Sequence, residues 1–282
     1  MDRWLMRLAR VIGASLGALA GIAAVQFMRL RRMEFLGHPG FYINHVVQPT
    51  SGQTSGPALR LVVLGDSTTA GVGVDRPEHA LPYLLAQRLA DAEGRPVRVT
   101  SYGWAGARVA DLVRQQLPRA LEPLRATETE PYLPGADIVA VVIGANDATH
   151  RTPPWRYRTD LRMTLEGVRA AAPEARLVLA GIPAFRGALR QIEPLIFLTD
   201  QFARLLRPIS RQEAARVDAA FADLARDVPG RLRDRDEALS RDRFHPSHVG
   251  YAAWADVIAE ALARGPDPTD ASADEPFEVA GI

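Results

Sequence analysis

Two reactive residue types are missing from this chain of 282 residues: it has no cysteine, and all 34 of its basic side chains are arginine. The lack of cysteine excludes disulfides, a thiolate nucleophile and cysteine ligands for a metal. The lack of lysine excludes a lysine nucleophile and a Schiff base. Any covalent chemistry must therefore use an oxygen or an imidazole.

An excess of charge of either sign is also missing, since the formal net charge is +1. The sequence has no basic stripe interleaved with aromatic residues, which argues against nucleic-acid binding. Hydrophobic residues make up 47% of the chain, enough for a sizeable core. The length is typical of one globular domain of about 200 residues with an extension at each end.

The N-terminal extension contains a stretch without charge, residues 11–28, with three arginines on each side. About 18 such residues can just span a bilayer as a helix. Gly13, Gly17 and Gly21 also have the four-residue spacing that lets membrane helices approach closely. We therefore expect residues 1–32 to anchor the protein in a membrane, with the rest of the chain outside the cytoplasm.

Two alternatives remain for this N-terminal segment. Ala18-Leu19-Ala20 offers a small-x-small cleavage site, so the segment could be a signal peptide whose removal gives a secreted protein. It could also be a helix on the surface or in the core. The arginines flank both sides equally, so the positive-inside rule does not decide the orientation.

Composition divides the remainder of the chain into three parts. Residues 33–58 are predicted to be a linker, because 48–57 contains only Gln, Pro, Thr, Ser and Gly. Residues 59–264 form the predicted globular domain. Residues 265–282 carry five acidic side chains and no basic one, which is typical of a disordered tail.

Strand and helix patterns alternate through residues 59–264, which indicates a parallel sheet with helices on both faces. The run at 137–143 is continuously apolar, as expected of a central strand with both faces buried. A fifth, short strand is expected within 228–240. The other elements are predicted as strands at 59–64, 97–102 and 175–180, and as helices from about 81, from about 109, and at 154–171, 208–227 and 246–263.

Polar or glycine-bearing loops follow the first three predicted strands. They are Gly65-Asp66-Ser67, Gly103-Trp104-Ala105-Gly106 and Gly144-Ala145-Asn146-Asp147. The carboxyl ends of parallel strands lie along one edge of the sheet, where ligands bind, so these loops should meet there. Asp242-Arg243-Phe244-His245-Pro246 immediately precedes the last helix and should bring His245 beside Ser67.

These residues can perform nucleophilic catalysis together. A serine hydroxyl needs a base within hydrogen-bond reach and a third group that orients the base. His245 is the candidate base and Asp242 the candidate orienting carboxylate. The N–H of Ser67, the N–H of a glycine after the second strand and the amide of Asn146 could bind the oxyanion of a tetrahedral intermediate.

The three blocks resemble those of the SGNH hydrolases, also called GDSL-type esterases and lipases. Gly65-Asp66-Ser67 resembles the nucleophile block, Gly144-Ala145-Asn146-Asp147 the Gly-x-Asn-Asp block, and Asp242-Arg243-Phe244-His245-Pro246 the Asp-x-x-His-Pro block. The resemblance extends over residues 59–263. Thr68 replaces the leucine of the name-giving block. Thr69 stands where the GxSxG elbow of other serine hydrolases has its second glycine.

The resemblance implies a three-layer α/β/α sandwich with a flavodoxin-like, mostly five-stranded parallel sheet, no metal or other cofactor, and hydrolysis of esters or thioesters. It implies a catalytic triad of Ser67, Asp242 and His245. The oxyanion hole would be formed by Ser67, Gly106 and Asn146. Gly103 is the alternative glycine, but the sequence that begins at Gly106 is more similar to the family's glycine block.

Each motif also has a structural interpretation when taken alone. Ser67 would cap a helix, Asn146 and Asp147 would stabilise a turn, and Asp242 would be solvated. The order and placement of the motifs together favour a catalytic site. A metallophosphoesterase that binds two metals is a rival enzyme, and a membrane-anchored binding module without turnover is a non-enzymatic alternative.

The substrate is open at this stage. Small-molecule or lipidic esters fit the apolar residues of 184–206, and acetyl groups on polysaccharide fit almost as well. The same segment has more apolar residues than one helix face requires. It is therefore either a core helix or a flexible lid over the site.

Overall fold

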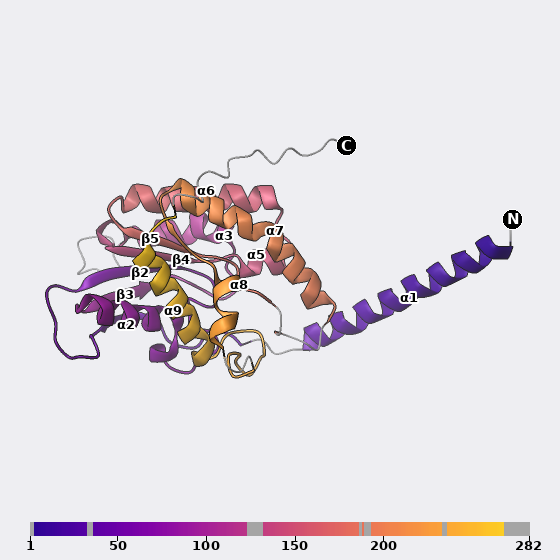
Figure 1. The fold of residues 1–282 in the computed structure, drawn as a ribbon, viewed down its shortest axis with the longest axis horizontal. Coiled ribbons are helices and arrows are strands. Elements are labelled where there is room, and N and C mark those ends of the chain that lie inside the picture. Colours follow the sequence, from indigo (N-terminus) through magenta and orange to yellow (C-terminus); the bar gives the residue numbers. More distant parts are fainter. Residues whose placement is uncertain are drawn as a thin grey trace.

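The computed structural model describes residues 3–32, 36–122, 132–185, 188, 193–232 and 236–267. A long N-terminal helix extends away from a domain whose helices cover both faces of a twisted sheet (Figure 1). The main elements along the chain are α1 (Arg3–Arg32), β1 (Asn44–Val47), β2 (Leu59–Gly65), α2 (Leu81–Glu93), β3 (Val97–Ser101), α3 (Val109–Asp111), α4 (Leu117–Ala120), β4 (Ile138–Val142), α5 (Ala145–Thr149), α6 (Pro154–Ala171), β5 (Arg176–Ala180), α7 (Leu195–Arg216), β6 (Ala220–Ala222), α8 (Leu224–Asp227) and α9 (His248–Arg264).

In the described part of the chain the sheet has six strands, in the order β1-β3-β2-β4-β5-β6. β1 pairs antiparallel with β3, and the other neighbours are parallel. Without β1 the order is that of a flavodoxin-like, doubly wound sheet. The predicted α/β/α architecture is confirmed, with one antiparallel edge strand in addition to the five parallel strands.

Successive residues of a strand point to opposite faces of the sheet, and the two cores follow this alternation. In β2, Leu61 and Val63 belong to the core that α2 and α9 cover, whereas Val62 and Leu64 belong to the core that α6 and α7 cover. All five residues of β4 are buried, as expected for the central strand. The layers therefore hold the carboxyl ends of β2, β3 and β4 side by side.

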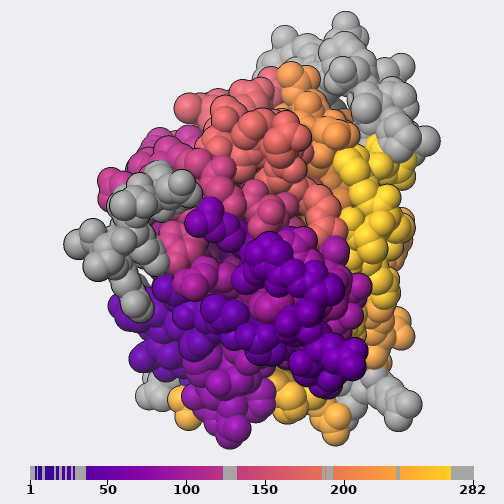
Figure 2. All heavy atoms as spheres, turned by 90° about the vertical axis from the view of Figure 1, so that its left-hand side faces the viewer, coloured from indigo at the N-terminus to yellow at the C-terminus, as the bar shows by residue number. Residues whose placement is uncertain are grey.

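β1 lies inside the range 33–58, which was predicted to be a linker. Ile43 and Val47 are buried, while Val46 is exposed at the edge of the sheet. Pairing with β3 satisfies the hydrogen-bonding groups of the strand's backbone. The strand has only a few apolar residues, and these are easily missed within a polar range. In Figure 2 the indigo residues that precede β2 form part of the front surface, and α9, in yellow, lies along the right-hand side.

The fifth parallel strand was predicted in the wrong place. It is β6, inside the range 208–227 that was predicted as a helix, and not within 228–240. β6 has three residues, two of them alanine, so it gives almost no strand signal. The helix expected to begin at Pro208 is the second half of α7, which continues through that proline. A proline inside a helix costs about 3 kcal/mol, and the burial of Leu206 and Ile209 in the core offsets this cost.

Residues 3–32 form a helix, but among the described residues no helix is long and apolar enough to cross a membrane. The predicted transmembrane anchor is therefore not supported. At the other end of the chain, residues 268–282 lie outside the described residues, and with them most of the predicted acidic tail.

Candidate active site

The chain turns sharply where β2 ends, and this turn presents Ser67. The Asp66 carboxylate accepts hydrogen bonds from the N–H of Thr68 at 3.0 Å and from its hydroxyl at 2.8 Å. The carbonyl of Asp66 accepts from the N–H groups of Thr69 and Ala70, both at 3.1 Å. Burial raises the pKa of Asp66, and the hydrogen bonds from Thr68 oppose that rise. The carboxylate and carbonyl of Asp66 therefore hold the turn that presents Ser67.

Thr69 explains two of the glycines near this turn. A Cβ added to Gly65 would come within 2.7 Å of the Thr69 side chain, and one added to Gly103 within 1.8 Å. Only glycine fits on either side of the buried threonine. The N–H of Gly103 donates to the hydroxyl of Ser101 at 3.3 Å. Gly103 is thus needed for packing against Thr69, and its N–H is already used in a hydrogen bond.

The structure brings Ser67, His245 and Asp242 into one hydrogen-bonded chain. Ser67 Oγ is 3.0 Å from His245 Nε2, and His245 Nδ1 is 2.7 Å from Asp242 Oδ2. Burial opposes the charge of Asp242, but the hydrogen bonds from His245 and Phe244 outweigh it and hold the pKa of Asp242 well below its usual range. An ionised carboxylate only accepts hydrogen bonds, so Nδ1 carries the proton and Nε2 is free to accept that of Ser67.

A tight turn orients Asp242. Its Oδ1 accepts from the Ser240 hydroxyl at 2.8 Å and from the N–H groups of Phe244 and His245, both at 3.0 Å. Arg243 lies in the left-handed region, at φ 59°, which turns both N–H groups back toward the carboxylate. Such backbone conformations are costly for a side chain other than glycine and are concentrated at functional sites.

Asn146 lies at the start of α5, next to the loop that follows β3. Its Nδ2 donates to the carbonyl of Ala107 at 3.0 Å, which places the amide beside Gly106, at φ +83°. No described residue accepts the second hydrogen of this amide. Within the described ranges, the N–H groups of Ser67 and Gly106 donate to no acceptor. All three groups predicted for the oxyanion hole therefore have a hydrogen available.

Asp147, the neighbour of Asn146, joins the same loop to α5. Its Oδ2 accepts the N–H of Val109 at 3.0 Å, so the carboxyl group caps the start of α3 from across the loop. The residue is buried, and burial raises the pKa of its carboxyl group to about 6. Asp147 is therefore a structural partner of the Gly106 loop.

Gln116 is a buried residue that the motifs do not reveal. It ends the π-helix Leu112–Gln116 and is fully buried. Its Oε1 accepts the N–H of Gly65 at 2.8 Å, and its Nε2 donates to the carbonyl of Gly65 at 2.7 Å. π-helical turns inside helices are frequent at functional sites. No signal in the sequence distinguishes this glutamine from its exposed neighbour, Gln115.

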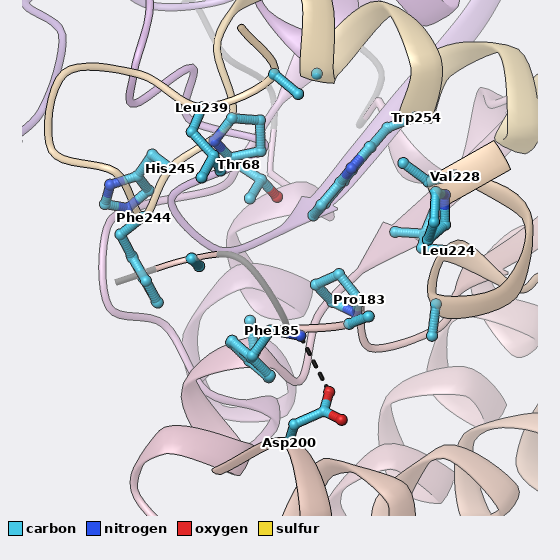
Figure 3. Close-up of a pocket in the computed structure, with 18 of the residues that line it drawn as sticks. Thr68, Pro183, Phe185, Asp200, Leu224, Val228, Leu239, Phe244, His245 and Trp254 are labelled. Atoms are coloured by element: carbon cyan, nitrogen blue, oxygen red, sulfur yellow. Dashed lines mark hydrogen bonds between the residues drawn. The ribbon is translucent and has the colours of Figure 1, made fainter. Parts of the chain in front are cut away.

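Ser67, Asn146 and His245 line a cavity of about 320 Å³. Its other walls are mostly apolar. Figure 3 shows His245, Thr68 and Leu239 on one side, Leu224, Val228 and Trp254 on the other, and Pro183 with Phe185 below. Leu224 belongs to α8, Val228 follows it and Trp254 belongs to α9. Leu232 also lines the cavity.

The wall at Phe185 is fixed by α7. Asp200 accepts the N–H of Phe185 at 3.1 Å and a hydrogen bond from Arg207 at 3.0 Å, and Arg207 also donates to the carbonyls of Ile182 and Pro183. Burial opposes the charge of Asp200, but hydrogen bonds from Arg207 and Phe185 lower its pKa.

Residues 184–206 are predicted to be either a core helix or a lid, and the structure shows a helix in the second half of this segment. Residues 195–206 belong to α7 and place Ile196, Ala203 and Leu206 in the core. Phe185 and Ala188 line the cavity, while 186–187 and 189–192 lie outside the described residues. Movement of the segment stays a prediction.

The metallophosphoesterase alternative is not supported. In the described ranges, no group of three or more His, Asp or Glu side chains could hold a metal ion. Asp66 and Asp147, two of the ligands such a site would use, instead cap backbone turns.

Comparisons with known proteins agree with the fold. The model of the GDSL-like Lipase/Acylhydrolase family matches residues 63–253. A GDSL-like esterase of Mycobacterium tuberculosis is 27% identical over 209 residues, covering 72% of this chain but 62% of that protein, less than two thirds of its length. The lipase/acylhydrolase from Enterococcus faecalis has a TM-score of 0.55 at 23% identity, over 74% of this chain and 98% of that one.

A second solved structure, the acetylxylan esterase Axe2 from Geobacillus stearothermophilus, has a TM-score of 0.52 at 20% identity, over 73% of this chain and 95% of that one. At these identities the two structures show a shared fold. The family model, by contrast, matches well over half of the sequence and spans the blocks of Ser67, Asn146 and His245. The chain therefore belongs to the GDSL-like lipase/acylhydrolase family of SGNH hydrolases.

Proposed function

We propose that the protein hydrolyses carboxylic esters through an acyl-enzyme on Ser67. The observation that carries this proposal is the chain of hydrogen bonds from Ser67 through His245 to Asp242, 3.0 Å and 2.7 Å long, at the wall of an apolar cavity. A serine with this base and this orienting carboxylate is the arrangement that acyl transfer requires.

The reaction proceeds in two halves. Ser67 Oγ attacks the ester carbonyl carbon while its proton passes to His245 Nε2, and the carbonyl oxygen becomes an oxyanion. The carbon–oxygen bond to the alcohol then breaks, and His245 gives its proton to the leaving alcohol. A water molecule, deprotonated by the same nitrogen, attacks the acyl-Ser67 ester. Collapse of this second intermediate releases the carboxylic acid and returns the proton to Ser67.

Three donors stabilise both oxyanions in this mechanism. They are the N–H groups of Ser67 and Gly106 and the second amide hydrogen of Asn146. Since the two N–H groups have no other acceptor among the described residues, binding the oxyanion breaks no existing hydrogen bond. Preorganised donors of this kind lower the barrier without reorganisation during the reaction.

The shape and chemistry of the cavity support an acyl substrate with an apolar chain. The cavity of about 320 Å³ is at the small end of ligand-binding pockets. Leu224, Val228 and Trp254 form its apolar end, which favours a short or medium acyl chain over an acetyl group on a large polysaccharide.

The test compares Ser67→Ala with the matched control Ser51→Ala, which changes an exposed serine outside the cavity. Hydrolysis of p-nitrophenyl butyrate and covalent labelling by a fluorophosphonate are measured for both. We expect Ser67→Ala to lose both signals and Ser51→Ala to keep both. Full hydrolysis by Ser67→Ala would end the proposal. A wild-type protein that neither hydrolyses esters nor takes the label would instead favour a binding module without turnover.

A further inference from the structure

A segment that precedes the region matched by the family model approaches the triad from outside. We call residues 36–43 the N-terminal strap. One end of the strap is tied to the sheet, because Ser101 N–H donates to the carbonyl of Ile43 at 2.9 Å and Ile43 is buried. The ring of Phe41 lies against Gly71, where an added Cβ would come within 3.0 Å of it. The strap is thus packed onto the catalytic domain.

The other end of the strap reaches Asp242. The N–H of Leu36 donates to Asp242 Oδ2 at 3.3 Å, and this is the oxygen that accepts from His245 Nδ1. The hydrogen bonds to Oδ1 all come from residues 240–245. Among the described residues, Leu36 is therefore the donor to this carboxylate that comes from a distant part of the sequence.

The strap also encloses the triad. With Leu36 in place, the Asp242 side chain is 1% exposed. Residues 36–39 form one wall of a second cavity, of about 520 Å³, whose other walls include Ser240 and Ser247. Charged or titratable groups that face this cavity are His38, Asp75, His79, Arg241 and His248.

We propose that the strap is part of the catalytic unit and that the Leu36 N–H is a positioning group for Asp242. A carboxylate oxygen has two lone pairs, one for His245 and one for Leu36. The Leu36 bond helps to hold Oδ2 in the orientation that accepts from His245 Nδ1, and it gives this oxygen a second donor. The inference rests on the proposed function, because it assigns a role within the same triad.

The experiment replaces one main-chain N–H group of the full-length protein with an oxygen atom, which cannot donate a hydrogen bond. An ester bond is introduced at position 36 by incorporating the 2-hydroxy acid analogue of leucine, which deletes the N–H and keeps the side chain. Leu36→Pro is the version made by ordinary mutagenesis, and Leu36→Ala is the matched control that keeps the N–H. The readouts are kcat and KM for p-nitrophenyl butyrate, and the proton resonance of the His245–Asp242 hydrogen bond in the NMR spectrum.

We expect the ester variant to lower kcat about fivefold, the effect of one ordinary hydrogen bond, with KM within about twofold of the wild type. The His245–Asp242 resonance should shift in the ester and proline variants and stay in place in Leu36→Ala. An ester variant with wild-type kcat and an unmoved resonance would overturn the inference. An equal loss in Leu36→Ala would also overturn it, since the side chain would then be responsible.

The outcomes separate this inference from the proposed function. If the wild type hydrolyses no ester, the proposed function fails, while the resonance still tests the contact between Leu36 and Asp242. If the wild type is active and the ester variant is indistinguishable from it, the positioning role fails and the triad stands. Should Leu36→Pro fail to fold, the ester variant decides alone.

Discussion

The side-chain amide of Gln116 forms hydrogen bonds with both main-chain polar groups of Gly65, two residues before Ser67. The two distances, 2.8 Å and 2.7 Å, are those of well-formed hydrogen bonds. Gly65 is the last residue of β2, where the sheet no longer supplies every partner for its backbone. Gln116 therefore fixes the point from which the turn carrying Ser67 begins.

Replacing Gln116 by methionine tests this relationship. Methionine has a similar volume but leaves the N–H and the carbonyl of Gly65 without partners in a buried place. We expect a loss of about 2–4 kcal/mol in the free energy of unfolding and, because Ser67 is less well placed, a fall in kcat of about tenfold. Urea unfolding and ester kinetics check the two effects. Gln115→Met, on the exposed side of the same helix, is the control and should change neither. A variant destabilised with unchanged kcat would restrict Gln116 to a structural role.

Replacing Asn146 by alanine removes one of the three proposed oxyanion donors. We expect kcat to fall by roughly 10²–10³, the usual loss for one such donor, with a much smaller effect on KM. Steady-state kinetics on p-nitrophenyl butyrate measure this. Thr149→Ala, on the same short helix, should remain within about twofold of the wild type. A loss below about tenfold in Asn146→Ala would argue that the amide only holds the Ala107 loop.

Asp147 should make stability depend on pH. Its pKa is about 6 in the folded protein and has an ordinary value of 3.8, so between these values the folded state keeps a proton that the unfolded state releases. The free energy of unfolding contributed by this group therefore falls as pH rises from about 4 to 6, by an upper limit of roughly 3 kcal/mol. Asp147→Asn cannot release a proton and should lack this fall. In urea unfolding between pH 4 and 8, the free energy of unfolding of Asp147→Asn should rise relative to that of the wild type up to about pH 6. Above that pH the difference should stay constant. Curves that stay parallel throughout would contradict the raised pKa.

Trp254 should limit the length of the acyl chain. It lies at the apolar end of the cavity, on the side opposite His245 (Figure 3). Trp254→Ala lengthens that end, so the ratio of kcat/KM for p-nitrophenyl octanoate to that for the acetate should rise about tenfold. Trp155→Ala, which removes a tryptophan 70% exposed on α6, should leave the ratio unchanged. An unchanged ratio in Trp254→Ala would place the acyl chain elsewhere.

The sequence predicted the central elements well because their patterns are strong. β4 is continuously apolar, and α6 has both a proline at its start and apolar residues at helical spacing, so its predicted limits of 154 and 171 agree with the structure. The three blocks that carry Ser67, Asn146 and His245 could be placed at one edge from the alternation of strands and helices alone. That Ser67 and His245 are in contact is then a consequence of the topology.

Features that depend on contacts between distant residues were missed. β1 and β6 are short and have little pattern of their own, and their pairing partners decide that they are strands. Gln116, Leu36 and Asp200 form hydrogen bonds with residues that no spacing rule connects with them. The predicted helix boundary at Pro208 was wrong for a related reason, since packing against the core outweighed the local preference.

Ser67 and His245 are 178 positions apart in the sequence. During synthesis the N-terminal part of a chain emerges and begins to fold first. Ser67 therefore leaves the ribosome well before His245, and the hydrogen bond between them can form only after residue 245 has been synthesised. A partly synthesised chain that ends before residue 245 contains Ser67 without His245. The order of synthesis thus delays the hydrogen bond between Ser67 and His245 until the domain is nearly complete.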